Sequence, residues 1–429
     1  DFGAAGNGVA KDTAAIQQAI SQTARQGGGT IFFPPGCYLA GTLYLEDNIH
    51  LKLSPGAVLL GSPDRADYNA DDFCPQNRVF TKEKVSGAHL LVALHKKNIT
   101  LSGGAVDGNR QVWLNQVDTE RPAKFLRPEW RPGQMIFFCE CENIRIRDTE
   151  LLNPPYWTCF LHGCDHVFIR GVKVKNDFRT PNGDGFDIDC CRNVCISDCQ
   201  IESGDDCFAI RGNTAPLSDS GRPCEWITIT NCTLSTPCNA FRIGVGDGVV
   251  RNISVSNCII HNTRTGICII NRYGQNTPGV AIENISFDNI RMDTVRPLMI
   301  AADVRGPDDR PSKFLRNISF SHIRGRGCRS NFIEGNSDCN LSGITLDDVI
   351  FEYYGGDEIE ACMKRQGSFG EFGISTADAA FYLRNASDIE FNRVRVKWGK
   401  LTGSWKSALN VENVADLSIR DCSLLPPEP

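Results

Sequence analysis

Hydrophobic and polar residues alternate along most of the chain in short runs of four or five, and Asn, Asp or Gly separates one run from the next. Alternation with a period of two, bounded by turn residues, is typical of β-strands. One phrase of this kind returns many times. It reads NIRIRDTELLN from Asn143, NVCISDCQIES from Asn193, NISVSNCIIHN from Asn252 and NISFDNIRMDT from Asn284. The pattern therefore predicts a repeat of short strands.

The spacing of the repeat predicts its architecture. Counted from Ile144, we expect the equivalent apolar positions at Phe168, Val194, Ile227, Ile253, Ile285, Ile318 and Ile344, with weaker copies near Ile49, Ile99, Ile389 and Leu417. One copy cannot bury its apolar side alone, so the copies must stack. Steps of 24 to 33 residues without a helical pattern fit coils of a parallel β-helix, whereas propeller blades need steps of about 40–50. The sequence thus predicts an all-β, right-handed parallel β-helix whose variable loops build a cleft.

One segment near the start has helical spacing instead. We expect Asp12-Thr13 to cap this helix and Gly27-Gly28-Gly29 to end it. Its apolar face consists of Ala14, Ala15, Ile16, Ala19, Ile20 and Ala24. Such a helix would cover the open end of the stacked coils. We interpret residues 1–45 as this cap with the first coil and residues 140–350 as regular coils that carry the site. Because no linker interrupts the pattern, residues 1–429 are expected to form a single domain.

Charge and hydropathy exclude several functions. A net charge of −6 and a pI near 5.7 argue against nucleic-acid binding, which needs a basic face. No apolar run reaches the ~18 residues of a membrane span. The chain opens at Asp1 without Met, which is consistent with a removed secretory signal.

Twenty cysteines leave two interpretations open. Most lie inside the β-rich segments, where free Cys serves as a small buried apolar residue, but a few disulfides are the alternative. No CxxC pair occurs and only seven His are present, so we expect no structural metal site and no cofactor.

Two polar phrases interrupt the repeat, PNGDGFDIDCCRN from Pro181 and ESGDDCFAIRG from Glu202. Asp184 and Asp205 are 21 residues apart, close to one short coil, so Asp184 is expected ~5 Å from the pair Asp205-Asp206. Like charges at that range raise the pKa of at least one member, as a general acid requires. The alternatives are ordinary turn residues or a calcium site.

These phrases also resemble a known family. The opening DFGAAGNGVAKDTAAIQQAI looks like the N-terminal segment of pectin-degrading β-helix proteins, and NGDGFDID with SGDDCFAI is similar to the NTDG and DD motifs of glycoside hydrolase family 28, the polygalacturonases and their relatives. The resemblance implies an inverting hydrolysis in which Asp205 is the general acid, while Asp184 and Asp206 hold and deprotonate the attacking water. Inversion needs acid and base carboxyls ~6.5–9.5 Å apart.

Two other family motifs are altered here. In CNAFRIG, Asn239 stands at the family's His position and Arg242 at its Ser position, and in TGICIINRYG, Cys268 and Ile270 replace the Arg and Lys of the RIK motif. Those cations would pair with a substrate carboxylate. Either Arg242 and Arg272 take over this role, or the sugar there is neutral or differently placed. We therefore favour a substrate other than plain homogalacturonan.

The candidate substrate-binding residues are Asn182, Asn239, Arg242, Arg272, Tyr273, Arg211, His162 and Trp130. Several of them have a simpler alternative. Asn239 would be the usual turn residue of such a coil, and Arg242 and Arg272 would be ordinary surface charges. The segment from Arg121 to Arg131 around Trp130 would be a solvated loop instead of a wall of the sugar-binding groove.

Two other functions compete with hydrolysis of a pectic polysaccharide. A uronate lyase or epimerase needs calcium or a Lys or Arg base, and only Arg211 lies beside the carboxylates in sequence. A non-catalytic carbohydrate-binding β-helix would explain the altered motifs but not the intact carboxylates. The expected partner is a polysaccharide or oligosaccharide, with no nucleic acid and no membrane. We expect a monomer or weak oligomer, secreted or periplasmic because polymer substrates lie outside cells.

Overall fold

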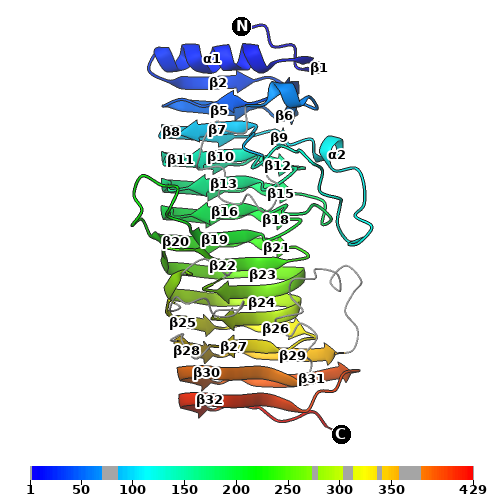
Figure 1. The fold of residues 1–429 in the computed structure, drawn as a ribbon, viewed down its shortest axis with the longest axis vertical. Coiled ribbons are helices and arrows are strands. Elements are labelled where there is room, and N and C mark those ends of the chain that lie inside the picture. The colour runs from blue at the N-terminus through cyan, green and yellow to red at the C-terminus, as the bar shows by residue number, and fades with distance from the viewer. Residues whose placement is uncertain are drawn as a thin grey trace. The chain divides into compact units, whose positions relative to one another are not determined.

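The computed structural model describes residues 2–69, 86–272, 279–302, 313–335, 341–356 and 378–428. The chain divides into an N-terminal unit, Asp1–Asp206 with Ala215–Ser220, and a C-terminal unit, Cys207–Thr214 with Gly221–Pro429. Each unit is built from coils of short parallel strands (Figure 1). Among the described residues, no helix has the length and apolar character needed to cross a bilayer.

In the N-terminal unit each full coil adds one strand to each of three parallel sheets, and neighbouring coils pair in register. The first sheet contains β2 (Gly29–Phe33), β5 (Ile49–Leu53), β8 (Lys97–Ser102), β11 (Glu142–Arg147), β14 (Asp165–Arg170) and β17 (Arg192–Ser197). The second contains β4 (Leu43–Tyr44), β7 (Leu91–Leu94), β10 (Ile136–Cys139), β13 (Cys159–His162) and β16 (Phe186–Asp189). The third contains β1 (Asn7–Lys11), β3 (Gly36–Ala40), β6 (Ala57–Gly61), β9 (Ala105–Asp107), β12 (Glu150–Leu152), β15 (Lys173–Lys175) and β18 (Gln200–Glu202).

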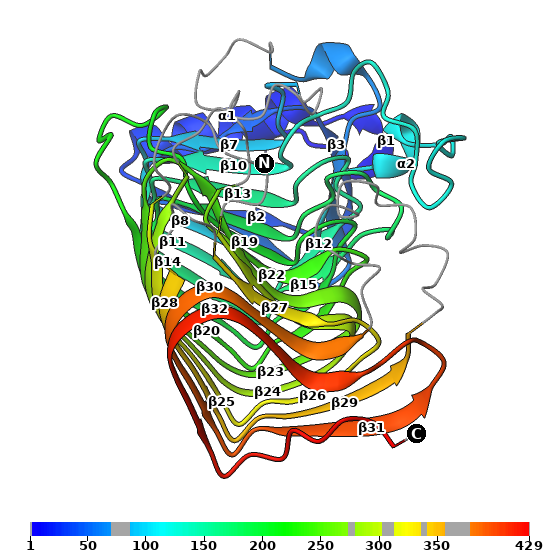
Figure 2. The ribbon, with the colours of Figure 1, turned by 60° about the horizontal axis from the view of Figure 1, so that its bottom comes forward.

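The C-terminal unit repeats this plan with longer strands, several of which turn the corner from one sheet into the next (Figure 2). Its strands are β19 (Phe208–Gly212), β20 (Cys224–Thr230), β21 (Thr233–Ser235), β22 (Asn239–Gly246), β23 (Val249–Ile270), β24 (Ala281–Ala301), β25 (Leu315–Ser321), β26 (Arg324–Gly327), β27 (Asn331–Glu334), β28 (Leu341–Asp347), β29 (Ile350–Gly355), β30 (Ala379–Asn392), β31 (Arg395–Leu401) and β32 (Ser407–Arg420). Every pairing between them is parallel.

The interior of the coils is lined by the apolar residues that the repeat predicts, with one correction. Ile285 pairs in register with Ile253 on one side and Ile318 on the other. The predicted equivalence of Phe168 is wrong by one residue, because Val167 is the buried partner of the preceding coil and Phe168 is 41% exposed. The register follows the left-handed turn residue, His166 with φ 53°, which directly precedes the buried position. Apolarity alone could not choose between two adjacent apolar residues.

The predicted helix is confirmed as α1 (Thr13–Arg25), which buries Ile16, Ala19 and Ile20. It packs against β2, β4 and β5 and lies across the N-terminal end of its unit (Figure 1). The predicted capping by Asp12 is wrong in detail. Asp12 occupies the N-cap position, but its carboxylate makes no cap hydrogen bond and accepts instead from the backbone amides of Ala5 and Gly6 at 2.6 and 3.0 Å.

The cysteines of the described residues are free thiols. Seventeen are present and most are buried, whereas Cys74, Cys339 and Cys362 lie outside the described residues. Several Sγ atoms donate to carbonyls of the turns, as Cys232 does to Thr230 at 3.2 Å. The interpretation as small interior residues therefore holds for this part of the chain.

Asparagine side chains form ladders along the turns between coils. In the C-terminal unit Asn284 donates to Asn252 at 3.1 Å and accepts from Asn317 at 3.2 Å. All three residues have φ between 55 and 57°. Asn tolerates this left-handed conformation better than most residues, and its amide both donates and accepts. The recurrent Asn of the repeat phrase is thus explained by turn geometry.

We expect Asn284→Ala to lower the free energy of unfolding by about 1–2 kcal/mol, because it loses the ladder bonds and strains the left-handed turn. Asn284→Gly should lose less, since Gly adopts positive φ without strain. Urea denaturation followed by circular dichroism measures both. Equal losses for Ala and Gly would show that backbone strain is not part of the effect.

Candidate active site

The two polar turns of the N-terminal unit lie side by side. Gly183 O accepts from the backbone amides of Gly204 at 2.8 Å and Asp205 at 3.3 Å, and Gly185 N donates to Asp206 O at 2.8 Å. Asp184 therefore lies between Gly183 and Gly185, whose backbones are hydrogen-bonded to the turn that carries Asp205 and Asp206 in the next coil. Adjacent strands are ~4.7–4.9 Å apart. The structure thus places the backbone of Asp184 beside the backbones of Asp205 and Asp206.

The three carboxylates differ in their access to solvent. Asp184 is 3% exposed and Asp206 is 7% exposed, whereas Asp205 is half-buried. The backbone oxygen of Asp184 accepts from both the amide and the hydroxyl of Thr158, at 2.9 and 2.7 Å. The Ser203 hydroxyl donates to the backbone oxygen of Asp205 at 2.7 Å. Asp205 is therefore the most accessible of three residues whose backbones are held in place.

Two glycines allow the turns to approach this closely. A Cβ on Gly183 would lie 2.6 Å from Nδ2 of Asn176, and a Cβ on Gly204 would lie 2.5 Å from the backbone oxygen of Thr180. Real Cβ atoms do not come so near to polar atoms, so a larger residue at either position would move its aspartate. The Gly of each acidic phrase is a packing requirement of the turn.

Two buried cationic side chains, Lys124 and Arg131, donate hydrogen bonds to backbone oxygens in and beside the two acidic turns. Both come from the segment between α2 (Arg110–Trp113) and β10. Lys124 Nζ donates to the backbone oxygen of Gly204 at 2.6 Å. Arg131 Nη1 donates to the backbone oxygens of Pro155 at 2.9 Å and Pro181 at 2.8 Å. Lys124 is 8% exposed and Arg131 only 1%, so neither belongs to a solvated loop or an open sugar-binding wall. Sequence reasoning missed this role because backbone carbonyls leave no signature in the sequence.

Three further candidates of this unit lie in different environments. Asn182 is 9% exposed, has φ 54°, and accepts from Arg131 Nη2 at 3.4 Å. His162 is fully buried and its ring stacks on Phe160 at 5.1 Å. Trp130 is half-buried and packs edge-on against Trp113, with ring centroids 5.0 Å apart. Asn182 lies two residues before Asp184 in the chain. Substrate contacts by all three residues stay predictions.

The remaining candidates belong to the C-terminal unit. Arg211, Asn239, Arg242 and Arg272 are all buried, at 6, 1, 3 and 1% exposed. Arg242 Nη1 donates to the backbone oxygen of its neighbour Ile243 at 2.6 Å. Tyr273 lies outside the described residues. The three arginines are therefore buried side chains and not ordinary exposed surface charges.

The altered RIK positions form an apolar cluster. Cys268 pairs in register with Arg242 on one side and Met299 on the other. Cys268, Ile270, Met299 and Ala301 pack together and are buried. Buried apolar side chains therefore stand where the RIK motif would have two cations.

Three further buried arginines were missed from the sequence. Arg264, Arg296 and Arg329 are 1 to 2% exposed, and Arg296 lies over the ring of Phe332 at 4.9 Å. Burial lowers the pKa of Arg296 to about 9; the Cys268 thiol opposes this shift, and Arg264 and Arg329 reinforce it. The available signal was their spacing of 32 and 33 residues, which equals the coil step.

Comparison with known proteins places the chain in a family. The sequence model described as "Glycosyl hydrolases family 28" matches residues 72–369, more than half of the chain. The chain belongs to glycosyl hydrolases family 28. A family relative from Vitis vinifera, described as "Probable polygalacturonase", is 27% identical over 69% of this chain. The chain spans about 60% of that relative's length.

Solved structures in the family have the same fold. The family 28 exopolygalacturonase of Yersinia enterocolitica matches with a TM-score of 0.70 and 17% identity, covering 97% of this chain and 77% of that one. The hyperthermoactive exopolygalacturonase of Thermotoga maritima matches with a TM-score of 0.67 and 22% identity, covering 82% and 86%. The predicted all-β parallel β-helix is thereby confirmed.

Proposed function

We propose that this family 28 member is a glycoside hydrolase that cleaves glycosidic bonds of a pectic or related polysaccharide. The observation that carries the proposal is the backbone pairing of Gly183 with Gly204 and of Gly185 with Asp206, which sets Asp184 against Asp205 and Asp206. Paired carboxylates are the catalytic groups of most glycoside hydrolases. The Vitis vinifera relative, a probable polygalacturonase, supports a pectic substrate.

The mechanism that we propose is inverting. Asp205 donates a proton to the leaving oxygen, which suits its greater accessibility. Asp184 and Asp206 hold the attacking water and take its proton. Proton transfer by a positioned side chain typically contributes 10²–10⁴-fold to the rate. Lys124 and Arg131 donate to backbone oxygens of the turns and their neighbours, and Arg131 also donates to the Asn182 side chain, so we assign them a positioning role.

The substrate that we propose is not plain homogalacturonan. Cys268 and Ile270 lie in a buried apolar cluster where the family motif has cations, and apolar side chains cannot pair with a uronate carboxylate. Arg264, Arg296 and Arg329 remain in the same unit as buried cations, which favours a chain that still contains acidic sugars. We also infer a secreted or periplasmic location, because such polymers lie outside the cytoplasm.

The proposal is tested by incubating the protein with a panel of pectic, other acidic and neutral polysaccharides without added metal. Released reducing ends and the ultraviolet absorbance of unsaturated uronates are recorded together. New reducing ends without unsaturated products are the expected result. Unsaturated products would identify a lyase and overturn the proposal.

A further inference from the structure

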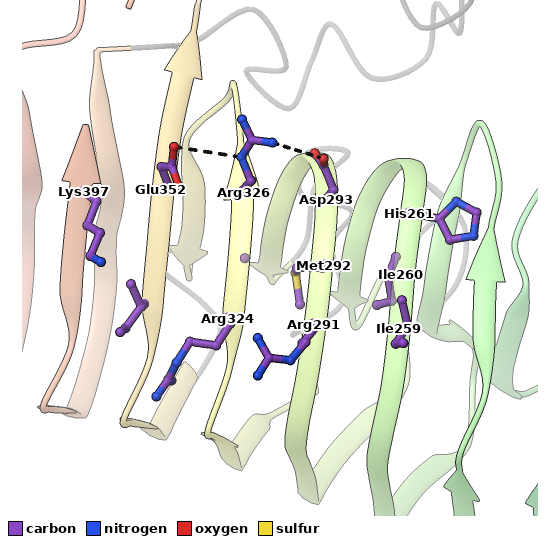
Figure 3. Close-up of a pocket in the computed structure, with 12 residues that line it drawn as sticks. Ile259, Ile260, His261, Arg291, Met292, Asp293, Arg324, Arg326, Glu352 and Lys397 are labelled. Atoms are coloured by element: carbon purple, nitrogen blue, oxygen red, sulfur yellow. Dashed lines mark ion pairs between the residues drawn. The ribbon is translucent and has the colours of Figure 1, made fainter. Parts of the chain in front are cut away.

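The C-terminal unit carries a groove on the outer face of five neighbouring parallel strands, β23, β24, β26, β29 and β31 (Figure 3). Its volume is about 390 Å³. It shares no residue with the carboxylate turns of the N-terminal unit. Seven of its twelve lining residues are polar or charged.

Strand register arranges the lining in two rows, each with one residue per coil. The first row is Ile259, Arg291, Arg324 and Ile350. The second row is Asp293, Arg326, Glu352 and Lys397. Successive members of a row are separated by the strand spacing of ~4.7–4.9 Å, about the length of one pyranose unit. The groove is therefore a periodic surface whose repeat suits a sugar chain running across the coils.

Two cations of the groove are available to a ligand. Arg326 lies between Asp293 and Glu352, at 3.6 and 4.0 Å, and is neutralised by them (Figure 3). Arg324 is held by Asp348 through two hydrogen bonds. By contrast, the exposed Arg291 and Lys397 have no acidic partner within 4.0 Å among the described residues.

We propose that this groove binds a second stretch of an acidic polysaccharide, a uronate chain. Carboxylates would pair with Arg291 and Lys397, and the C–H faces of the rings would pack on Ile259, which is 52% exposed, and Ile350. The chain as a whole carries −6, so this excess of cations is local. The choice of a uronate rests on the proposed function, but binding itself needs no turnover. Such a site would hold the enzyme on its polymer.

The test is affinity electrophoresis in gels that contain polygalacturonate. All proteins carry Asp205→Asn, so that the polymer is not shortened. The groove variant adds Arg291→Gln and Lys397→Gln. The matched control adds Arg145→Gln and Lys175→Gln, which remove two exposed strand cations from the N-terminal unit. Melting curves check that each variant is folded.

We expect the groove variant to lose roughly fivefold or more in apparent affinity, the control to keep the parent value, and retardation to weaken as salt rises. Equal retardation of the groove and control variants would overturn the proposal. Equally strong binding of the parent to dextran sulfate or DNA would overturn it too, because the surface would then bind any polyanion. Retardation in the gel needs no cleavage, so a failure of the hydrolase proposal, seen as no new reducing ends with the unsubstituted protein, leaves this binding measurement interpretable.

Discussion

Asp205→Asn is expected to lower the turnover of the preferred polysaccharide by about 10²–10⁴-fold, because the leaving oxygen loses its proton donor. The backbone of Asp205 is held by Gly183 and Ser203 through contacts that the amide side chain does not disturb. The melting temperature should therefore stay close to that of the parent. Initial rates of reducing-end release measure the effect.

Two comparisons make this result specific to a general acid. Asp198→Asn, the same change at an exposed turn of the N-terminal unit, should leave the rate unchanged. A substrate with a nitrophenol leaving group needs little protonation, so Asp205→Asn should slow its cleavage far less. If the variant kept more than about a tenth of the parent rate on the polysaccharide, Asp205 would not be the acid.

Arg131→Met is expected to lower the free energy of unfolding by about 3 kcal/mol, because two buried carbonyls lose charge-assisted hydrogen bonds. One of these carbonyls is Pro181 O, at the start of the Asp184 turn. Displacement of that turn should also lower turnover by about 10–100-fold, since small misplacements of catalytic groups are costly. Urea denaturation and initial rates measure the two effects.

Arg131→Lys keeps the charge but not the forked geometry, and should fall between the parent and Arg131→Met in both measurements. Arg145→Met, an exposed position on β11, is the control and should change neither. A destabilised Arg131→Met that kept full turnover at low temperature would show that Arg131 supports the fold and not the position of Asp184.

The sequence predicted the coils well because their signal is periodic. The buried position of most coils follows a left-handed Asn, Asp or His, and Trp226 and Gly343 take that place before Ile227 and Ile344. The left-handed residue also explains the slip at Phe168, because it is His166 that precedes the buried Val167. The adjacency of the two acidic turns was predictable for the same reason, since a separation of one coil step places two phrases side by side. Lys124 and Arg131 were not predictable, because their partners are backbone carbonyls of distant turns.

The cation arrangement of the C-terminal unit was only partly predictable. The loss of the RIK cations was visible at Cys268 and Ile270, but their packing with Met299 and Ala301 required the strand register. Arg264, Arg296 and Arg329 are separated by one coil step each, but the residues around them share no sequence motif. Burial, which separates them from ordinary surface arginines, is a property of the folded coil.

Hydrolysis by paired carboxylates with an activated water inverts the anomeric configuration, so the configuration of the first product distinguishes it from a double displacement. Proton NMR of the parent enzyme acting on its preferred polysaccharide should show a newly formed anomer whose configuration is opposite to that of the cleaved linkage, before mutarotation mixes the two forms. A first product with the configuration of the linkage would mean a covalent intermediate on one aspartate, and would contradict the roles assigned to Asp184, Asp205 and Asp206.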